Sequence, residues 1–440
     1  MELKDLPRVD DLTARVAAVG LPRQLAVGIA RAAIDSARYE IHNGGSADAL
    51  ATAVAAAELV AASRPTRIIN ATGVLLHTNL GRAVLPAPAV DAMLRSAVAY
   101  GNVELDTTTG RRGSRAAYGR QLLCAVSGAE AGLAVNNNAG ALLLSLAAVA
   151  GHGNVIVSRG EEIEIGGSFR LPELMAASGS KLVEVGTTNR TRLADYEREV
   201  ESAAAILKVH PSNYRVQGFA ESASLEELAD LAKSHNVPLI ADVGSGLLDA
   251  TVPWLPGGAP SWLADEPAVR QSLETGADLV LCSGDKLLGG PQSGIAFGRA
   301  DLVEKMAKHP LARAVRIDGP THAALAATLE LYADDRGAEV PFWTMVSLGY
   351  DELEGRHRRL LDALGRDADL VRGESLPGAG SVPGEAIPSP NLRFDGADEL
   401  FARLLHASPP ILGRRLAGTL VIDLRTVDPE DDKHVAAALT

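Results

Sequence analysis

The first 62 residues carry hydrophobic side chains at helical spacing and show none of the alternation that is typical of a strand. Alanine and leucine recur every three or four positions, as in helices that bury one face. Gly20-Leu21-Pro22 and Asn43-Gly44-Gly45 interrupt this pattern, and such clusters break helices. The pattern therefore predicts a small N-terminal unit of short helices over residues 1–62, and Arg64-Pro65-Thr66 marks the exit from it.

From Arg67 onward, short runs rich in valine, isoleucine and leucine alternate with helical patterns. Seven runs are predicted as strands: LAVN (133–136), NVIVS (154–158), KLVEVG (181–186), AAILKVH (204–210), VPLIADVG (237–244), ADLVLCSG (277–284) and SGIAFG (293–298). Between them lie helices such as Ser224–Asn236, which begins with a serine and a nearby acid, as a capping box does. Strands that alternate with helices predict an α/β fold with a large, mainly parallel sheet covered on both faces.

The C-terminal part of the chain has a different texture. The stretch from Gly373 to Pro390 is rich in glycine and proline, and it is predicted as a long loop. After it, NLRFDG, a helical pattern over Ala397–Ala407 and the run TLVIDLRTV (419–427) predict a small α+β unit. Three domains are therefore expected, over residues 1–62, 63–325 and 326–440.

Composition places the chain among globular proteins, since 47% of its 440 residues are hydrophobic. No apolar run approaches the ~20 residues that a membrane-spanning helix needs, and Ala139–Ala150 is predicted as a buried helix. The N-terminus has acids among its bases and no apolar stretch, so it is not predicted to be a secretory signal.

Cysteine content and charge narrow the picture further. Only Cys124 and Cys282 are present, far apart and without metal-ligand spacing, so neither a disulfide framework nor a metal site is predicted and a cytoplasmic location is favoured. The net charge of −13 argues against a surface coated by nucleic acid, although local basic patches remain compatible with it. Basic residues gather in two clusters: Arg111, Arg112, Arg115 and Arg120, and then Arg299, Lys305, Lys308, Arg313 and Arg316.

Three polar clusters follow predicted strands, at the sheet edge where ligands of open α/β folds bind. They are NNNAG (136–140), ADVGSG (241–246) and SGDK (283–286). The first opens a helix, whose free N–H groups suit a phosphate, although asparagine also serves as a simple helix cap. It is not GxGxxG and lacks the GK[ST] ending, so neither a dinucleotide site nor a P-loop is indicated.

Asp242 and Lys286 could supply the chemistry of pyridoxal phosphate (PLP). A strand-end aspartate can pair with the protonated ring nitrogen of PLP, or it can merely cap a turn. A lysine beside an apolar strand end loses solvation, which lowers its pKa from about 10.4 and favours a nucleophile, although most lysines are surface residues. Ser283 could donate to a phosphate. The order of helix start, strand-end Asp and then Ser-Gly-x-Lys-x-x-Gly predicts a PLP-dependent enzyme of fold type I.

Longer motifs resemble those of bacterial L-seryl-tRNA(Sec) selenium transferases, the selenocysteine synthase family. They are INATGVLLHTNLGRAVL (69–85), VNNNAGALLL, VSRGEEIEIGGSFR (157–170), EVGTTNRT (184–191), KVHPSNYRVQGF (208–219), DVGSG, SGDKLLGGPQSGIAFG (283–298), HPLARAVRID (309–318), GAGSVPGEAIPS (378–389) and LVIDLRTV. The N-terminal helical unit is similar, less distinctively, to the family's tRNA-recognition domain.

The resemblance implies a transferase of selenocysteine biosynthesis. Its reaction would convert seryl-tRNA(Sec) to selenocysteinyl-tRNA(Sec) with selenophosphate, by β-elimination to a dehydroalanyl intermediate and addition of selenium. The resemblance also implies a cytoplasmic homodecamer, built as a ring-shaped pentamer of dimers.

The resemblance assigns roles to individual residues. Lys286 would carry PLP, with Asp285 assisting catalysis beside it, and Asp242 would pair with the ring nitrogen. The phosphate would lie among Asn136, Asn137, Asn138 and Ser283, and Ser245 would also belong to the cofactor site. Arg82, Arg313 and Arg316 would hold the selenophosphate oxyanion, because a guanidinium binds oxyanions with two hydrogen bonds.

Several roles stay open at this point. His77 is more often a structural histidine than a base, and the three arginines could be ordinary surface residues. Glu161 and Glu162 fall where this fold places the residue that covers the PLP ring, and the sequence does not say which of them does so.

Two other functions compete with the transferase. Related PLP-dependent lyases or aldolases of small phosphorylated sugar acids or amino acids share NATG, DxGSG and SGDKLxGGPQ, but they tend to lack the N-terminal helical unit that is present here. An inactive tRNA- or protein-binding paralogue is disfavoured by the intact Asp242, Asp285 and Lys286.

Overall fold

The computed structural model describes residues 3, 6–113, 117–165, 169–216, 218–365, 367–378 and 381–440. The chain forms two compact units, Met1–Ile68 and Ile69–Thr440. In its described residues the first unit contains the helices α1 (Val9–Ala17), α2 (Arg23–His42) and α3 (Ala49–Ala62). The helices end at the predicted breaks, because Gly20 adopts a left-handed φ of 84° after α1 and the Asp48 carboxylate accepts the first free N–H groups of α3.

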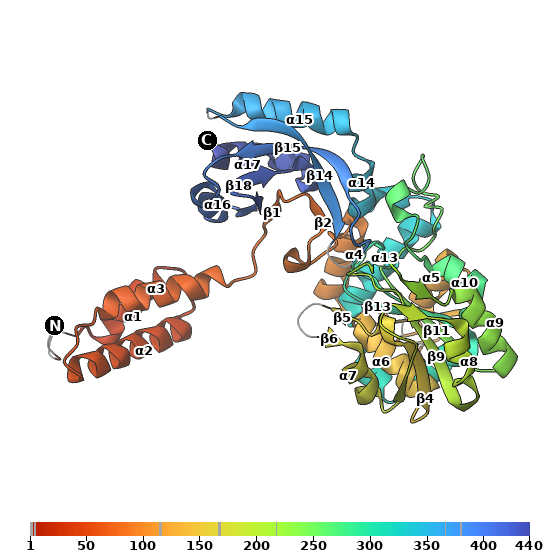
Figure 1. Ribbon diagram of the computed structural model, residues 1–440. Coiled ribbons are helices and arrows are strands. Elements are labelled where there is room, and N and C mark those ends of the chain that lie inside the picture. Colours follow the sequence, from red (N-terminus) through yellow and green to blue (C-terminus); the bar gives the residue numbers. More distant parts are fainter. Residues whose placement is uncertain are drawn as a thin grey trace. The chain divides into compact units, whose positions relative to one another are not determined.

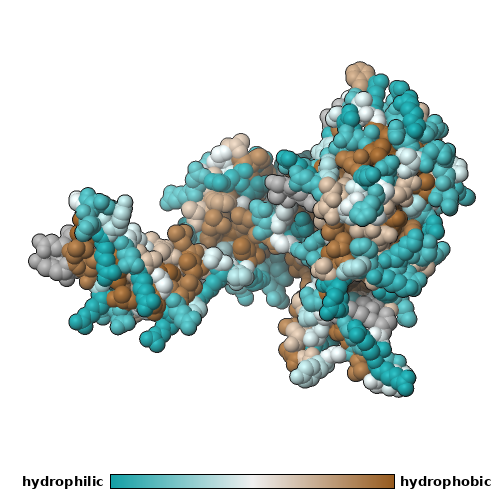
Figure 2. All heavy atoms as spheres, turned by 90° about the horizontal axis from the view of Figure 1, so that it is seen from below, coloured by the Kyte–Doolittle hydropathy of each residue, from teal (hydrophilic) through white to brown (hydrophobic). Residues whose placement is uncertain are grey.

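Small side chains hold the N-terminal helices together. Alanines at helical spacing on α2, among them Ala26, Ala30 and Ala33, are buried against Leu12 and Val16 of α1. Figure 2 shows hydrophilic side chains along these helices, with hydrophobic ones between them.

A seven-stranded sheet organises the second unit, in the order β3-β13-β12-β11-β9-β4-β7. The strands are β3 (Ala131–Val135), β4 (Asn154–Ser158), β7 (Lys181–Val185), β9 (Ala203–Val209), β11 (Leu239–Gly244), β12 (Leu279–Ser283) and β13 (Gly294–Gly298). All seven predicted strands are confirmed, with ends shifted by a few residues at most. Only β13 is antiparallel to its neighbours β12 and β3, so the predicted mainly parallel sheet is also confirmed.

Helices cover both faces of this sheet, as Figure 1 shows. Successive strand residues point to opposite faces, so Leu279 and Leu281 pack in one core while Val280 and Cys282 pack in the other. The first core includes α6 (Asn138–Val149), α7 (Leu171–Ser178) and α11 (Ala300–Lys308). The second includes α5 (Ala117–Ser127), α10 (Val269–Thr275), α13 (Gly319–Ala333) and α14 (Pro341–Ser347).

Shorter elements complete this part of the unit. The helices α8 (Leu193–Glu197) and α9 (Leu225–His235) pack near β7, and α9 has the predicted capping box between Ser224 and Glu227. The remaining elements before the C-terminal region are α4 (Ala87–Val98), α12 (Leu311–Ala314), β5 (Glu164–Ile165), β6 (Phe169–Arg170), β8 (Arg190–Thr191) and β10 (Glu221–Ser222).

A second sheet has the order β17-β18-β15-β14-β2. Its strands are β2 (Val74–Leu76), β14 (Asp369–Gly378), β15 (Ile387–Phe394), β17 (Arg414–Leu416) and β18 (Thr419–Ile422), and its helices are α15 (Tyr350–Ala363), α16 (Ala397–Leu405) and α17 (Asp432–Leu439). In addition, β1 (Ile69–Asn70) pairs with β16 (Ile411–Leu412). Residues 69–76, which the predicted boundaries place with the large sheet, thus form their strand pairs with C-terminal strands.

The prediction of a long loop over Gly373–Pro390 is wrong, because β14 and β15 occupy most of that stretch. Glycine and proline suggested a loop, but prolines fit a strand where one edge has no partner. Only residues 392–394 of β15 pair with β18, so the edge at Pro388 and Pro390 has no strand beside it in the described sheet. The Pro388 carbonyl instead accepts from Arg425 Nη2 at 2.8 Å.

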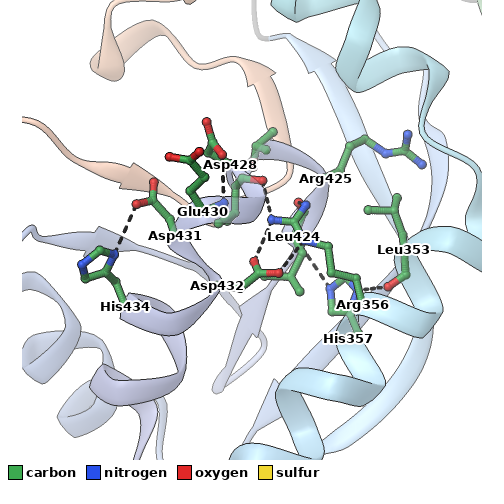
Figure 3. Close-up of polar contacts among 12 residues, drawn as sticks. Leu353, Arg356, His357, Leu424, Arg425, Asp428, Glu430, Asp431, Asp432 and His434 are labelled. Carbon is green, nitrogen blue, oxygen red and sulfur yellow. Dashed lines mark hydrogen bonds and ion pairs between the residues drawn. The ribbon is translucent and has the colours of Figure 1, made fainter.

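Buried charges anchor the C-terminal elements to one another. Arg356 of α15 forms two 2.7 Å hydrogen bonds to the Asp432 carboxylate and also donates to the carbonyls of Leu424 and Val427 (Figure 3). The next residue, His357, accepts from the Leu424 N–H at 3.1 Å. These bonds fix α15 against the segment that follows β18.

Candidate active site

Asp242 lies near the carboxyl end of β11 and is only 8% exposed. One oxygen of its carboxylate, Oδ1, accepts from Asn138 Nδ2 at 2.8 Å and from the Gly244 N–H at 3.1 Å. Burial raises the pKa of Asp242, whereas the Asn138 hydrogen bond and the charge of Lys286 oppose that change. Hydrogen bonds from Asn138 and Gly244 and the charge of Lys286 thus support the Asp242 carboxylate. Such support suits a carboxylate that pairs with a protonated ring nitrogen.

Lys286 lies just beyond β12, the strand next to β11, and is 7% exposed. Burial lowers the pKa of Lys286, and the Arg82 charge lowers it further, while Asp242, Asp285 and Glu266 partly offset both effects. An amine in this environment is neutral at lower pH than a surface lysine, and the neutral form is the nucleophile.

The loops after β11 and β12 are interlocked through their backbones. The Leu287 N–H donates to the Ser245 carbonyl at 2.9 Å. Gly246 adopts a left-handed φ of 76°, and a Cβ there would overlap the Ser283 carbonyl oxygen. A glycine is therefore required for the close approach that brings the two predicted functional loops together.

Arg82 contacts the loop that carries the lysine. Its Nη1 lies 2.7 Å from Oδ2 of Asp285, whose side chain is 6% exposed, against 35% for that of Arg82. The Ala83 N–H also donates to the Asp285 carbonyl at 3.2 Å. This pair positions Asp285 beside Lys286, and the guanidinium has further N–H groups for an incoming anion.

The structure gives the three predicted asparagines distinct places. Asn136 forms a backbone hydrogen bond to the Val315 carbonyl, Asn137 caps α6 through the Gly140 N–H, and Asn138 donates to Asp242. Ser283 is buried as the last residue of β12. Ser245 Oγ is buried without a hydrogen-bond partner in the described part of the chain.

Arg313 and Arg316 line a cavity of about 500 Å³ together with Arg120 and His322. This cavity is distinct from the one that contains Asp242. Arg316 forms an ion pair of 3.1 Å with Glu104, which also pairs with Arg112 at 2.9 Å. Of the other two members of the first arginine cluster, Arg111 is exposed and Arg115 lies outside the described residues.

His77, Glu161 and Glu162, whose roles the sequence left open, lie in different environments. Burial lowers the pKa of His77, and its Nδ1 has no hydrogen-bond partner among the residues that the structure describes. Glu161 accepts from Lys208 Nζ at 2.7 Å and from the Val209 N–H at 2.9 Å, and it lines the Asp242 cavity. Burial raises the pKa of Glu162.

The Asp242 cavity has a volume of about 600 Å³ and contains residues that the sequence did not single out. They include His210, which directly follows β9, and Glu266, which precedes α10. His210 was predicted as the last residue of the strand AAILKVH (204–210), and a polar residue at a strand end was a usable signal. Glu266 lies in an irregular segment, where no sequence period points to a function.

The site fits PLP on its own chemistry. It offers a buried amine for the carbonyl, a buried carboxylate for the ring nitrogen and the start of α6 for the phosphate. Ser245 Oγ and Asn138 Oδ1 are buried without hydrogen-bond partners in the described ranges, and a polar group bound there could supply them.

The described residues contain no group of three or more His, Cys, Asp or Glu side chains placed to hold a metal ion. Within the same part of the chain, every helix is too short or too polar to cross a membrane.

The sheet and its covering helices form the α/β fold of PLP-dependent enzymes of fold type I, as predicted. The solved structure of a D-glucosaminate-6-phosphate ammonia-lyase has a similar fold, with a TM-score of 0.61 and 22% identity over 85% of this chain and 95% of that one.

The chain belongs to the L-seryl-tRNA selenium transferase family, whose profile matches residues 68–428. The L-seryl-tRNA(Sec) selenium transferase of Nitratidesulfovibrio vulgaris is 46% identical over 85% of this chain and 81% of its own length. That of Solidesulfovibrio magneticus is 43% identical over 99% of this chain and 97% of its own. The predicted resemblance is confirmed, and with it the choice of the transferase over the lyase alternative.

Proposed function

We propose that this protein is a PLP-dependent L-seryl-tRNA(Sec) selenium transferase that converts seryl-tRNA(Sec) to selenocysteinyl-tRNA(Sec). Similarity to transferases along almost the whole chain supports the substrate. The observation that carries the chemistry is the buried pair of Lys286 and Asp242 at neighbouring strand ends.

The residues of the site have complementary tasks in this reaction. PLP supplies an electron sink for the charge that develops at the serine Cα. Lys286 would hold the cofactor through Nζ, and Asp242 would keep the ring nitrogen protonated. The neutral amine of Lys286 would accept the Cα proton, because burial disfavours its charged form, and it would return a proton so that the serine hydroxyl leaves as water. Selenium from selenophosphate would then bond to Cβ, a proton would return to Cα, and the phosphoryl group would pass to water as phosphate.

Selenophosphate is the proposed selenium donor, held by Arg82, Arg313 and Arg316. The Arg82 guanidinium already contacts the loop of Lys286 through Asp285. Arg313 and Arg316 line a cavity with a third arginine, Arg120, and the charge of these guanidinium groups favours an oxyanion.

A cytoplasmic homo-oligomer, assembled as a decamer of five dimers, completes the proposal. Helix α4 supports an assembly, since Val90, Leu94 and Val98 recur every four residues and are 41%, 56% and 80% exposed. An apolar stripe of this kind is typical of an interface. Sedimentation of the purified protein would measure the size of the oligomer.

Cofactor binding is tested by absorbance. The purified protein should show the long-wavelength band of lysine-bound PLP, and Lys286→Ala should lack it. Lys208→Ala, which changes a lysine that lines the Asp242 cavity, should retain it. A wild-type protein that stays colourless after incubation with PLP would refute the proposed chemistry.

The substrate is tested with seryl-tRNA(Sec) and selenophosphate, whose product should be selenocysteinyl-tRNA(Sec). Replacement of Arg313 by glutamine should raise the KM for selenophosphate without loss of PLP. Turnover of a small phosphorylated amino sugar, with none of seryl-tRNA(Sec), would instead favour a lyase.

A further inference from the structure

Glu266 is a buried carboxylate in the Asp242 cavity that the proposed chemistry does not use. Its side chain is 2% exposed, and Oε2 lies 3.4 Å from Nε2 of His210. Its other oxygen, Oε1, has no hydrogen-bond partner among the described residues. A carboxylate buried to this extent needs a cation close by, because its charge has lost solvation by water.

His210 connects this carboxylate to Asp242. It follows β9, the neighbour of β11, and its backbone N–H donates to the Asp242 carbonyl at 2.9 Å. The His210 side chain is 24% exposed, and its interaction with Asp242 lowers the pKa of that carboxyl, against the effect of burial. His210 thus contacts Glu266 through its ring and Asp242 through its backbone.

The other charged side chains of the site, Asp285, Arg82, Asp242 and Lys286, interact with one another. Asp285 pairs with Arg82 at 2.7 Å, and Asp242 accepts from Asn138 and faces Lys286. Lys286 uses its amine for the cofactor, and a bound amine no longer offers Asp242 the same charge. Besides Lys286, His210 is the other titratable side chain whose interaction lowers the pKa of Asp242, and the Glu266 carboxylate lies 3.4 Å from its ring.

We propose that Glu266 and His210 form a positioning pair, in which the Glu266 carboxylate holds the His210 imidazole and His210 in turn holds Asp242 ionised against the cofactor ring nitrogen. This inference rests on the proposed function, in so far as PLP is the cofactor. The pair acts through Asp242 and touches neither the cofactor carbonyl nor the serine.

The test compares two cofactors in the full-length protein. PLP has a ring nitrogen, and its 1-deaza analogue has carbon at that place, so a residue that supports ring protonation matters only for PLP. Glu266→Gln and His210→Gln should each raise the dissociation constant of PLP about tenfold, the equivalent of one pKa unit in ring protonation, and leave that of 1-deaza-PLP unchanged. Fluorescence titration measures both constants.

A double variant and a matched control complete the design. Because the two residues act as a unit, the double variant should bind PLP no more weakly than either single one. The control is Asp265→Asn, which removes a neighbouring carboxylate whose side chain is 83% exposed. It should bind both cofactors as the wild type does.

Each outcome has a distinct meaning. Equal losses for both cofactors would show a merely structural role, and unchanged PLP binding in the variants would also overturn the inference. If the isosteric Glu266→Gln does not fold, His210→Gln carries the same two-cofactor comparison. A wild type that binds neither cofactor contradicts the proposed function itself.

Discussion

The properties of Lys286 arise from its surroundings rather than from the residue type. A lysine in a turn is ordinarily solvated and charged, but here the side chain is buried behind two interlocked loops. Burial lowers its pKa first, and the adjacent Arg82 lowers it further. At the scale of single residues, cofactor attachment therefore depends on a neighbour more than two hundred positions away in the sequence.

Arg82→Gln should move cofactor attachment to higher pH. Without the guanidinium, Lys286 loses a repelling charge and Asp285 loses its partner, and both changes stabilise the protonated amine. The folded-state pKa of Lys286 then rises, so the neutral fraction at pH 7 falls about tenfold for each unit. The rate at which the PLP band appears, measured against pH, reports this midpoint.

Arg215→Gln is the control for that experiment. Arg215 lines the Asp242 cavity and forms ion pairs with Asp265 and Glu385, neither of which belongs to the lysine loop. Its midpoint should match that of the wild type. An Arg82→Gln midpoint that is unchanged or lower would contradict the electrostatic explanation.

A second residue-scale prediction concerns Arg425, which is 2% exposed. Its guanidinium donates to Ser375 Oγ and to the carbonyls of Met345, Leu348 and Pro388. Arg425→Ala would leave several of these groups buried and unpaired, at a cost of about 3–5 kcal/mol of stability. Thermal unfolding should show a lower midpoint, whereas Arg336→Ala, at an exposed ion pair with Glu339, should change little.

At the scale of elements, strands with a regular hydrophobic pattern could be predicted from the sequence. Strands and side chains whose partners are set by the folded sheet could not. The central strands β11, β12 and β13 of the large sheet could be predicted because they are buried on both faces and appear as apolar runs. The strands around Gly373 and Pro390 could not, since the open edge that tolerates the prolines exists only in the folded sheet. In the same way, Asn137 and Asn138 follow one another, yet one caps α6 and the other reaches Asp242.

The approach of two strand ends depends on Gly246. Gly246→Ala would place a Cβ against the Ser283 carbonyl at a left-handed φ, which costs about 1–3 kcal/mol in backbone strain alone. The loops would have to separate, so PLP binding should weaken together with thermal stability. Gly257→Ala, where a Cβ meets no atom within 4 Å, should alter neither measurement.

At the scale of the whole molecule, an acidic protein is proposed to bind an acidic partner. The net charge is −13, so favourable contacts with tRNA must come from local basic surfaces. In the helical N-terminal unit, the proposed site of tRNA recognition, Arg23 and Arg31 are exposed and lie eight residues apart on α2.

Replacing Arg23 and Arg31 together by glutamine should weaken tRNA binding and lower its salt dependence. The slope of log K against log salt should fall by about 1–2, as expected for the loss of one or two phosphate contacts. The matched control is the double variant Arg198→Gln and Arg358→Gln, whose side chains are 72% and 64% exposed in the other unit. Equal effects from both pairs would refute a specific role of the helical unit.

The sequence by itself determined the class of fold, the strand ends that carry Asp242 and Lys286, and the family, because periodicity and motifs are local properties of the chain. Tertiary structure alone decided which distant groups meet. It paired Arg82 with Asp285, joined Asn138 to Asp242, and placed Glu266 beside His210. Burial and charge at the site depend on these contacts, so the pKa changes that support its chemistry follow from folding.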